Sequence, residues 1–359
     1  MLDTLSGLGD RPVSWLQVYV ELTRFAASAN RARLRDKIRS LEDHGATGVS
    51  VSDHIFITTG GRPRTEHCEH GCDPLTTLAA VAGLSDVLAL QTVVMNSAWI
   101  HPGLLLRQFA QLAVLVGGER VTAGVGGGWS AEEFEALGLE MPTFGRRMAR
   151  LEEVLALARE LFDNGSATSA GQQVVARQLP LSPPPATPPR LLVGGGSDRV
   201  LAMAGRYADL LDLHGDPRHG RVAGATMAQA RIGDIRRRAL TTVEDLAGRM
   251  AIVREAEKAA GRRVGAVGVS TQVWHVVPGD QSQIRRLQAE LCTNWDLAEQ
   301  PLDRSPYLLF GSPSQMAEAL LERRAAYGLT RISLTEESDV PGATSDPLWF
   351  CRNVLPLLQ

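Results

Sequence analysis

The chain has 359 residues, of which 44% are hydrophobic and 21% are charged, and its formal net charge is −3. This composition excludes a disordered chain, because there is ample apolar material for a core. It also argues against a nucleic-acid partner, since no excess of positive charge is available to follow a phosphate backbone. The 4 cysteines are too few to form a disulfide framework in a chain of this length.

The N-terminal segment and the apolar runs favour the cytoplasm. Residues 1–15 include acidic side chains and lack the apolar core of a signal peptide. No run reaches the ~18 apolar residues that a membrane-spanning helix needs. We therefore expect a cytoplasmic protein with no membrane partner.

Short apolar runs alternate with longer amphipathic stretches along most of the chain. Helical spacing and end signals predict helices over residues 31–44, 73–83, 103–116, 144–162 and 197–207. The predicted strands are residues 16–20, 47–51, 88–95, 121–125, 190–194, 210–214, 266–277 and 330–335. Strict alternation of strand and helix predicts a parallel sheet with helical crossovers.

This pattern predicts a single (β/α)8 TIM barrel that spans residues 1–359. A doubly wound open sheet is the competing fold, but no GxGxxG opens the first strand–helix unit. Residues 164–189 interrupt the rhythm, because their prolines cannot continue a helix or a central strand. We interpret them as a surface insertion that contains a short hairpin.

In such a barrel the reactive groups lie at the carboxyl ends of the strands. Asp53 and His54 follow the second strand, and His214 ends the sixth. Two glycine clusters follow the fourth and fifth strands, namely Gly126, Gly127, Gly128 and Trp129, and Gly194, Gly195, Gly196 and Ser197. Bare backbone lets a flat ligand approach closely, and a helix N-terminus that begins at Ser197 can receive a phosphate. Tight-turn geometry alone is the alternative reason for either cluster.

Four segments together resemble the bacterial luciferase-like flavin oxidoreductases, and most closely the branch that uses the deazaflavin coenzyme F-420. They are SVSDHIF (Ser50–Phe56), the His-Pro of Ile100–Gly103, GVGGGW (Gly124–Trp129) before EEFEALG, and LLVGGGSDRVLAMAGRYAD. The resemblance is close over about Ala46–His214 and returns in FGSPSQMAEALLERRAAYGLTRISL. Their order and spacing are more specific than any one of them.

The resemblance implies a barrel whose strand ends hold an isoalloxazine-type ring. It implies that the phosphate lies near Gly194–Ser197, and that a bulge with a non-proline cis peptide, at Thr92–Val93, supports the ring. Asp53 and His54 match the Asp-His pair of the deazaflavin branch and are the expected catalytic residues, because an imidazole beside the ring can move a proton near neutral pH. His214 and Asn96 are expected to contact the substrate.

We therefore expect hydride transfer between coenzyme F-420 and a small organic substrate. A monooxygenase that uses reduced FMN and dioxygen is the first alternative, and a non-catalytic flavin-binding subunit is the second. Compared with relatives, Trp129 replaces the acidic residue of some deazaflavin dehydrogenases, which puts a sugar-phosphate substrate in doubt. Asp53 and Gly127 replace the His and Arg expected of FMN monooxygenases. The resemblance also implies a homodimer as one possible oligomeric state, because dimers are frequent in the family.

The segment His67–Cys72 holds two histidines and two cysteines within six residues. These residue types bind zinc, but the spacing is not a common zinc pattern and adjacent ligands are geometrically awkward. A substrate-pocket loop and a plain surface loop are the other interpretations. We expect no metal site.

Overall fold

The computed structural model describes residues 15–22, 30–58, 68–217, 227–298, 302–335, 344 and 346–359. Its centre is a closed barrel of parallel strands, in the order β10-β11-β12-β15-β1-β2-β5-β7, which the pairing of β10 with β7 closes. The strands are β1 (Gln17–Glu21), β2 (Gly48–Val51), β5 (Ala89–Thr92), β7 (Val121–Gly126), β10 (Arg190–Gly195), β11 (Leu210–Leu213), β12 (Gly268–Val273) and β15 (Leu329–Leu334). The predicted (β/α)8 barrel is confirmed.

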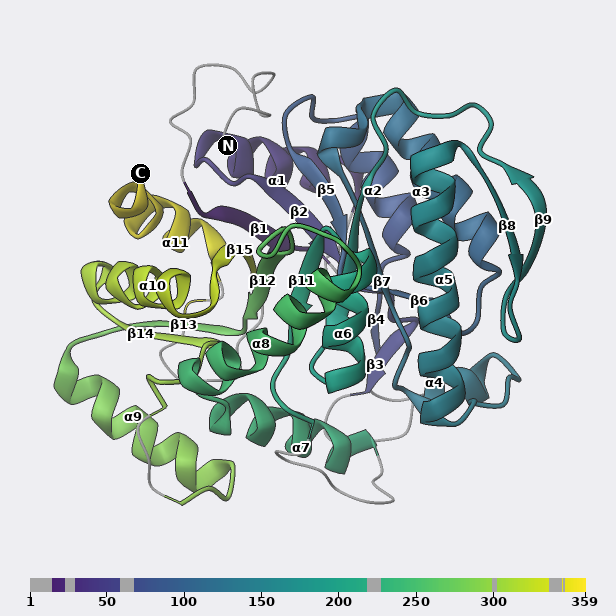
Figure 1. Cartoon of the computed structure of the whole chain (residues 1–359). Coiled ribbons are helices and arrows are strands. Elements are labelled where there is room, and N and C mark those ends of the chain that lie inside the picture. The colour runs from purple at the N-terminus through teal and green to yellow at the C-terminus, as the bar shows by residue number, and fades with distance from the viewer. Residues whose placement is uncertain are drawn as a thin grey trace.

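Helices surround the barrel on the outside (Figure 1). They are α1 (Arg31–Asp43), α2 (Pro74–Ala82), α3 (Pro102–Val116), α4 (Ala131–Ala136), α5 (Phe144–Asn164), α6 (Asp198–Tyr207), α7 (Met227–Leu240), α8 (Val243–Ala259), α9 (Gln281–Asn294), α10 (Pro313–Tyr327) and α11 (Pro347–Asn353). Several begin at a capping side chain, as α2 does at Asp73 and α6 at Ser197. Among the described helices, none is both long and apolar enough to cross a membrane.

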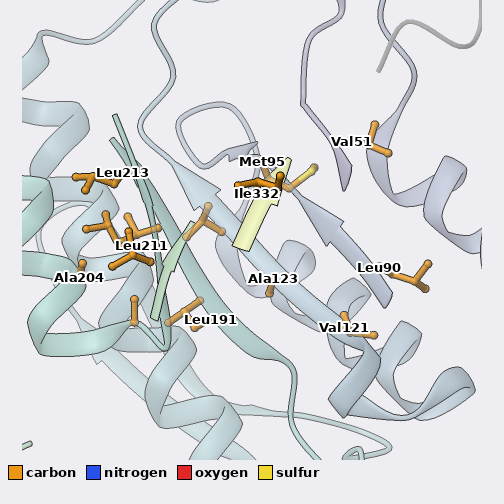
Figure 2. Packing of buried hydrophobic residues seen from close by; sticks show 14 of the residues in the cluster. Val51, Leu90, Met95, Val121, Ala123, Leu191, Ala204, Leu211, Leu213 and Ile332 are labelled. Carbon is orange, nitrogen blue, oxygen red and sulfur yellow. The ribbon is translucent and has the colours of Figure 1, made fainter. Parts of the chain in front are cut away.

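Apolar side chains on the outer face of the barrel strands pack beneath the helices and form the main core. Figure 2 shows part of this layer, where Leu211 and Leu213 of β11 lie near Ala204 of α6. The alternate residues of the same strands face the barrel interior, and many of these are polar, such as Gln91 and Arg331. The two faces of each strand thus have different roles, with packing outside and polar contacts inside.

Three small sheets lie outside the barrel. β8 (Ser166–Ala170) and β9 (Val175–Pro180) form an antiparallel hairpin within residues 164–189, and it lies at the edge of the molecule in Figure 1. β3 (Phe56–Thr58) pairs with β4 (Cys68–His70), and β13 (His275–Pro278) pairs with β14 (Leu308–Gly311). The last two pairs were not predicted.

Two predicted strands are shorter than the apolar pattern indicates. The strand predicted over 266–277 breaks at Trp274, whose N–H donates to the carbonyl of Tyr307 (2.9 Å) and starts the pairing with β14. The strand predicted over 88–95 ends at Thr92 and resumes as β6 (Met95–Asn96) after a bulge. The non-proline cis peptide in this bulge is Val93–Val94, one residue beyond the predicted bond. Thr92, which precedes this bond, uses its hydroxyl to bond both the N–H and the carbonyl of Gly124 in β7.

Candidate active site

His54 follows β2 at the rim of the barrel and is held by a buried carboxylate. Its Nδ1 donates to Oε2 of Glu133 (3.1 Å), and the other oxygen of Glu133 accepts the N–H of Ile55 (2.7 Å). Glu133 is only 2% exposed. A carboxylate at Nδ1 fixes the proton there, so Nε2 of His54 is the basic nitrogen.

Trp129 covers one side of this pair. Its ring meets the imidazole of His54 edge-on, with centroids 5.5 Å apart, while 55% of the residue remains exposed. The exposed indole thus offers an aromatic surface next to the imidazole. Trp129 belongs to the predicted cofactor set, and its contact with a cofactor stays a prediction.

Asp53 lies beside His54 but contacts a different loop. Its Oδ2 accepts the N–H of Asn96 (2.8 Å) at the end of the bulge. Burial raises the pKa of Asp53, and the carboxylates of Glu133 and Asp73 act in the same direction, whereas the Asn96 N–H and the charge of His54 lower it. Asp53 therefore ties β2 to the bulge rather than bonding to His54.

The bulge presents one half-buried apolar side chain, Val94, between two glycines. A Cβ at Gly126 would lie 2.4 Å from Cγ2 of Val94, and a Cβ at Gly194 would lie 3.1 Å from its Cγ1. The two glycines therefore make room for Val94 on the inner wall. The predicted residues Thr92 and Val93 are buried instead, and Thr92 bridges both the N–H and the carbonyl of Gly124.

The rest of the first glycine cluster is shaped by its own neighbours. A Cβ at Gly127 would lie 2.3 Å from the end of Met148, and one at Gly128, where φ is +69°, would strike the amide of Asn96 at 2.4 Å. Asn96 is buried, and its Oδ1 accepts the N–H of Ala98 (3.0 Å). Its contact with substrate stays a prediction, as does the role of these glycines toward a ligand.

The second glycine cluster leads into α6. Ser197 accepts the N–H of Val200 (3.3 Å) as the N-cap, and Gly195 has φ of +150°. Gly196 has no room for a side chain, since its Cβ would lie 2.2 Å from the carbonyl of Gly215. The chain needs glycine at 196 for this packing, whether or not a phosphate binds at the helix N-terminus.

Glu133, Arg249 and Asp212 shape the site but were not predicted from the sequence. Glu133 lies in a helix beyond the rim, and its signal was the acidic pair that follows the Gly-Trp segment. Arg249 of α8 is buried and donates to Asp216 (2.6 Å), to Asp198 (2.9 Å) and to the carbonyl of Gly196. It joins the start of α6 to the loop after β11, and no local pattern marks it.

His214 lies at the end of β11 with its Nε2 2.8 Å from Oδ2 of Asp212. β11 is four strands from β2 in either direction around the barrel, so His214 and His54 stand on opposite walls of the same rim. His214 was predicted from the sequence as a substrate contact, whereas its partner Asp212 was not predicted.

Within the described residues no three His, Cys, Asp or Glu side chains gather as a metal site. The segment His67–Cys72 is only partly covered by that statement. His67 lies outside the described residues, as do the side chains of Cys68, Glu69 and His70. Cys72 is buried with a free thiol.

The family model for luciferase-like monooxygenases matches residues 18–331 of the chain. The chain belongs to this family. It is 31% identical over 189 residues to the F-420-dependent glucose-6-phosphate dehydrogenase of Nakamurella multipartita. The aligned segment covers 52% of this chain and 53% of that protein. The chain thus matches about half the length of such curated relatives.

Two solved structures show the same fold over nearly the whole chain. One is an F-420-dependent secondary alcohol dehydrogenase in complex with an F-420–acetone adduct, with a TM-score of 0.68, 15% identity and coverage of 97% of this chain and 100% of the other. The other is an EDTA monooxygenase from Chelativorans sp. BNC1, with a TM-score of 0.66, 18% identity and coverage of 96% and 93%. At these identities the likeness concerns the barrel alone.

Proposed function

We propose that the protein is an oxidoreductase that transfers hydride between coenzyme F-420 and a small organic substrate. The observation that carries the proposal is the His54–Glu133 pair at the rim, opposite a second imidazole–carboxylate pair and on the same rim as the glycine-bordered side chain of Val94. The F-420-dependent relative supports the choice of cofactor.

The residues present fit a flat, ring-shaped cofactor. Val94 offers an apolar surface, and Gly126 and Gly194 leave room for its side chain on the wall. The phosphate of the cofactor would lie near Gly194–Ser197, at the N-terminus of α6. When bound, the deazaflavin supplies the group that accepts or gives up a hydride.

The chain itself supplies orientation and proton transfer. Glu133 fixes the imidazole of His54 so that Nε2 can take or give a proton. Trp129 shields one side of that imidazole from water. Asp53 holds the rim of β2 against the bulge by accepting the N–H of Asn96.

A monooxygenase that uses reduced FMN and dioxygen is the second candidate. It is supported by the description of the family model and by the EDTA monooxygenase among the structural neighbours. The absence of an acidic side chain at position 129 bears on a sugar-phosphate substrate and does not distinguish these two candidates, whereas Asp53 and Gly127 stand where FMN monooxygenases are expected to carry His and Arg.

Binding of the two cofactors tests the proposal. F-420 and FMN, each oxidised and reduced, are titrated into the purified protein and into the His54→Ala variant, with fluorescence as the readout. We expect the titrations to show tight binding of F-420 and weak binding of FMN. In a separate activity assay, we expect F-420-dependent turnover by the wild type and its loss in His54→Ala. Preference for FMN with consumption of dioxygen moves the protein to the monooxygenases. Binding of neither cofactor overturns both enzymatic candidates and favours a non-catalytic subunit.

The proposal includes a cytoplasmic homodimer that binds no nucleic acid. The net charge of −3 supports the last point. The outer face of α3 supports the dimer, because Leu104 and Leu115 are 56% and 71% exposed there. Light scattering of the purified protein gives the molar mass, and a monomer at micromolar concentration contradicts the dimer.

A further inference from the structure

The pair Asp212–His214 has the geometry of a second proton-transfer group. Asp212 is 1% exposed, and its Oδ2 lies 2.8 Å from Nε2 of His214. Its other oxygen, Oδ1, is buried without a hydrogen-bond partner among the described residues. A buried carboxylate with one free oxygen is costly to keep, so it is unlike the satisfied carboxylate of Glu133.

The carboxylate orients the imidazole. An ionised carboxylate only accepts hydrogen bonds, so the proton of neutral His214 resides on Nε2 and points at Asp212. Nδ1 is then the basic nitrogen, and within the described part of the chain it has no hydrogen-bond partner. His54 has the opposite arrangement, because its Nδ1 is the nitrogen bound to carboxylate.

The pair lies next to the surface assigned to the ring. A Cβ at Gly194 would lie 3.1 Å from Cγ1 of Val94 and 3.8 Å from Cβ of Asp212. Asp212 and Val94 are therefore neighbours across Gly194, one on each side of β10. A substrate that stacks beside the ring would lie between the two walls that carry His54 and His214.

The side chains of His214 and His54 differ in their exposure to solvent. The side chain of His214 is 43% exposed, whereas that of His54 is 19% exposed. A substrate arriving from solvent therefore meets His214 more readily than His54. Oxidation of an alcohol by hydride transfer releases one proton from the substrate hydroxyl, and the reduced cofactor takes one proton up, so two separate pairs suit the two proton transfers.

We propose that His214, positioned by Asp212, is the base that takes the hydroxyl proton of an alcohol substrate. This inference rests on the proposed F-420-dependent function. As the O–H proton passes to Nδ1 of His214, the carbinol C–H bond breaks and its electron pair leaves with the hydrogen as hydride to the oxidised coenzyme. The alcohol becomes a carbonyl compound, the coenzyme is reduced, and His214 is left as the imidazolium beside the Asp212 carboxylate.

The tautomer of His214 provides a test that needs no substrate. Long-range nitrogen–proton NMR of histidine-labelled protein, assigned with the His214→Gln variant, reports which nitrogen carries the proton. We expect protonated Nε2 and bare Nδ1 for His214, and a mixture of tautomers in Asp212→Asn. A proton on Nδ1 in the wild type overturns the proposal.

Kinetics on a defined panel test the role itself. The panel is 2-propanol, cyclohexanol and a long-chain secondary alcohol, each with oxidised F-420. We expect His214→Gln to keep the wild-type affinity for F-420 and to lower kcat by about 10²–10⁴-fold. Exogenous imidazole restores part of the rate to His214→Ala but none to Asp212→Asn, which a purely structural role would not produce. His44→Gln, whose histidine bonds to Ser40 away from the rim, serves as the control and keeps full activity.

The outcomes separate the two proposals. A wild-type protein that does not bind F-420 overturns the proposed function. A protein that binds F-420 but oxidises no alcohol of the panel overturns the assignment of an alcohol substrate. Oxidation at the wild-type rate by His214→Gln overturns the role of His214 and leaves the F-420-dependent function standing.

Discussion

The interior of the barrel contains polar groups at two levels, and they differ in where they lie and in what they bond to. Deep inside, Arg331 donates to the side-chain oxygens of Gln17 (2.7 and 2.9 Å) and Gln91, and its guanidinium lies over the ring of Tyr19 at 4.4 Å. At the rim, Asp212 and His214 form one bond with each other and leave Oδ1 and Nδ1 without a partner in the described structure.

The deep polar groups are expected to contribute to stability, and the polar groups at the rim are expected to contribute to function. The buried side chains around Arg331 hold the strands together, and even Nε2 of Gln91, which has no partner among the described residues, is fully buried there and closed to a ligand. Groups with unused donors or acceptors at the carboxyl ends of the strands are the ones that a ligand completes. Substitutions in the deep layer should therefore change folding, and substitutions at the rim should change binding and turnover.

The largest effect is expected at His54. We expect His54→Gln to lower F-420-dependent turnover by about 10²–10⁴-fold, because glutamine cannot exchange a proton. Steady-state kinetics and chemical denaturation are measured in parallel, and the unfolding free energy should hardly change. His101→Gln is the matched control, since His101 lies in a loop on the same rim and only caps Gly103. Equal turnover in both variants would remove His54 from the mechanism.

Arg331→Met tests the deep layer. Oε1 of Gln91 loses its donor while it stays buried, and Oε1 of the half-buried Gln17 loses the same donor. A buried group left unsatisfied costs about 1–3 kcal/mol. We expect a loss of about 3 kcal/mol in the free energy of unfolding, measured with urea, with normal turnover per folded molecule. Arg324→Met is the control, because Arg324 lies over Trp15 at the exposed surface. A fully stable Arg331→Met would mean that the deep layer does not stabilise the barrel.

Gly126→Ala tests the wall between the two levels. The new methyl group would lie 2.4 Å from Cγ2 of Val94 and push that side chain toward the proposed ring site. We expect F-420 affinity to fall about tenfold, or about 1.4 kcal/mol, with the fold intact. Val94→Ala in the same chain should restore most of the affinity, because the two sites are in contact and their effects couple. Additive losses in the double variant would contradict this packing.

Residues that directly follow a strand could be predicted from the sequence, and residues that reach the site by another route could not. Rim residues such as Asp53, His54 and His214 could be predicted because parallel strands bring their carboxyl ends to one edge, and the residue after each strand can be read directly. Glu133 and Asp212 could not, since one reaches the rim from a helix and the other is an inward-facing strand residue among apolar ones. Arg331 gave no local signal either, because its partners are about 240 and 314 positions away. Pairing across a barrel depends on closure, which periodicity does not encode.

The smallest effect is expected at Asp53, a single residue that affects both the stability of the fold and the geometry of the rim. The pKa of Asp53 is raised by burial, so the folded state binds its proton more tightly than the unfolded state does. Stability therefore falls as the pH rises through the interval between the unfolded and folded pKa values, and the ionised carboxylate remains a cost at neutral pH.

Asparagine at position 53 removes that cost while its Oδ1 can still accept the N–H of Asn96. We expect Asp53→Asn to gain on the order of 1 kcal/mol of unfolding free energy at pH 7 and to lose this gain as the pH approaches about 4. Urea denaturation over that range measures it, with the exposed Asp36→Asn as control. A gain that does not vary with pH would show that hydrogen bonding and not ionisation causes it. Slower turnover in the more stable variant would mean that the rim keeps a strained carboxylate for its function, as active sites commonly do.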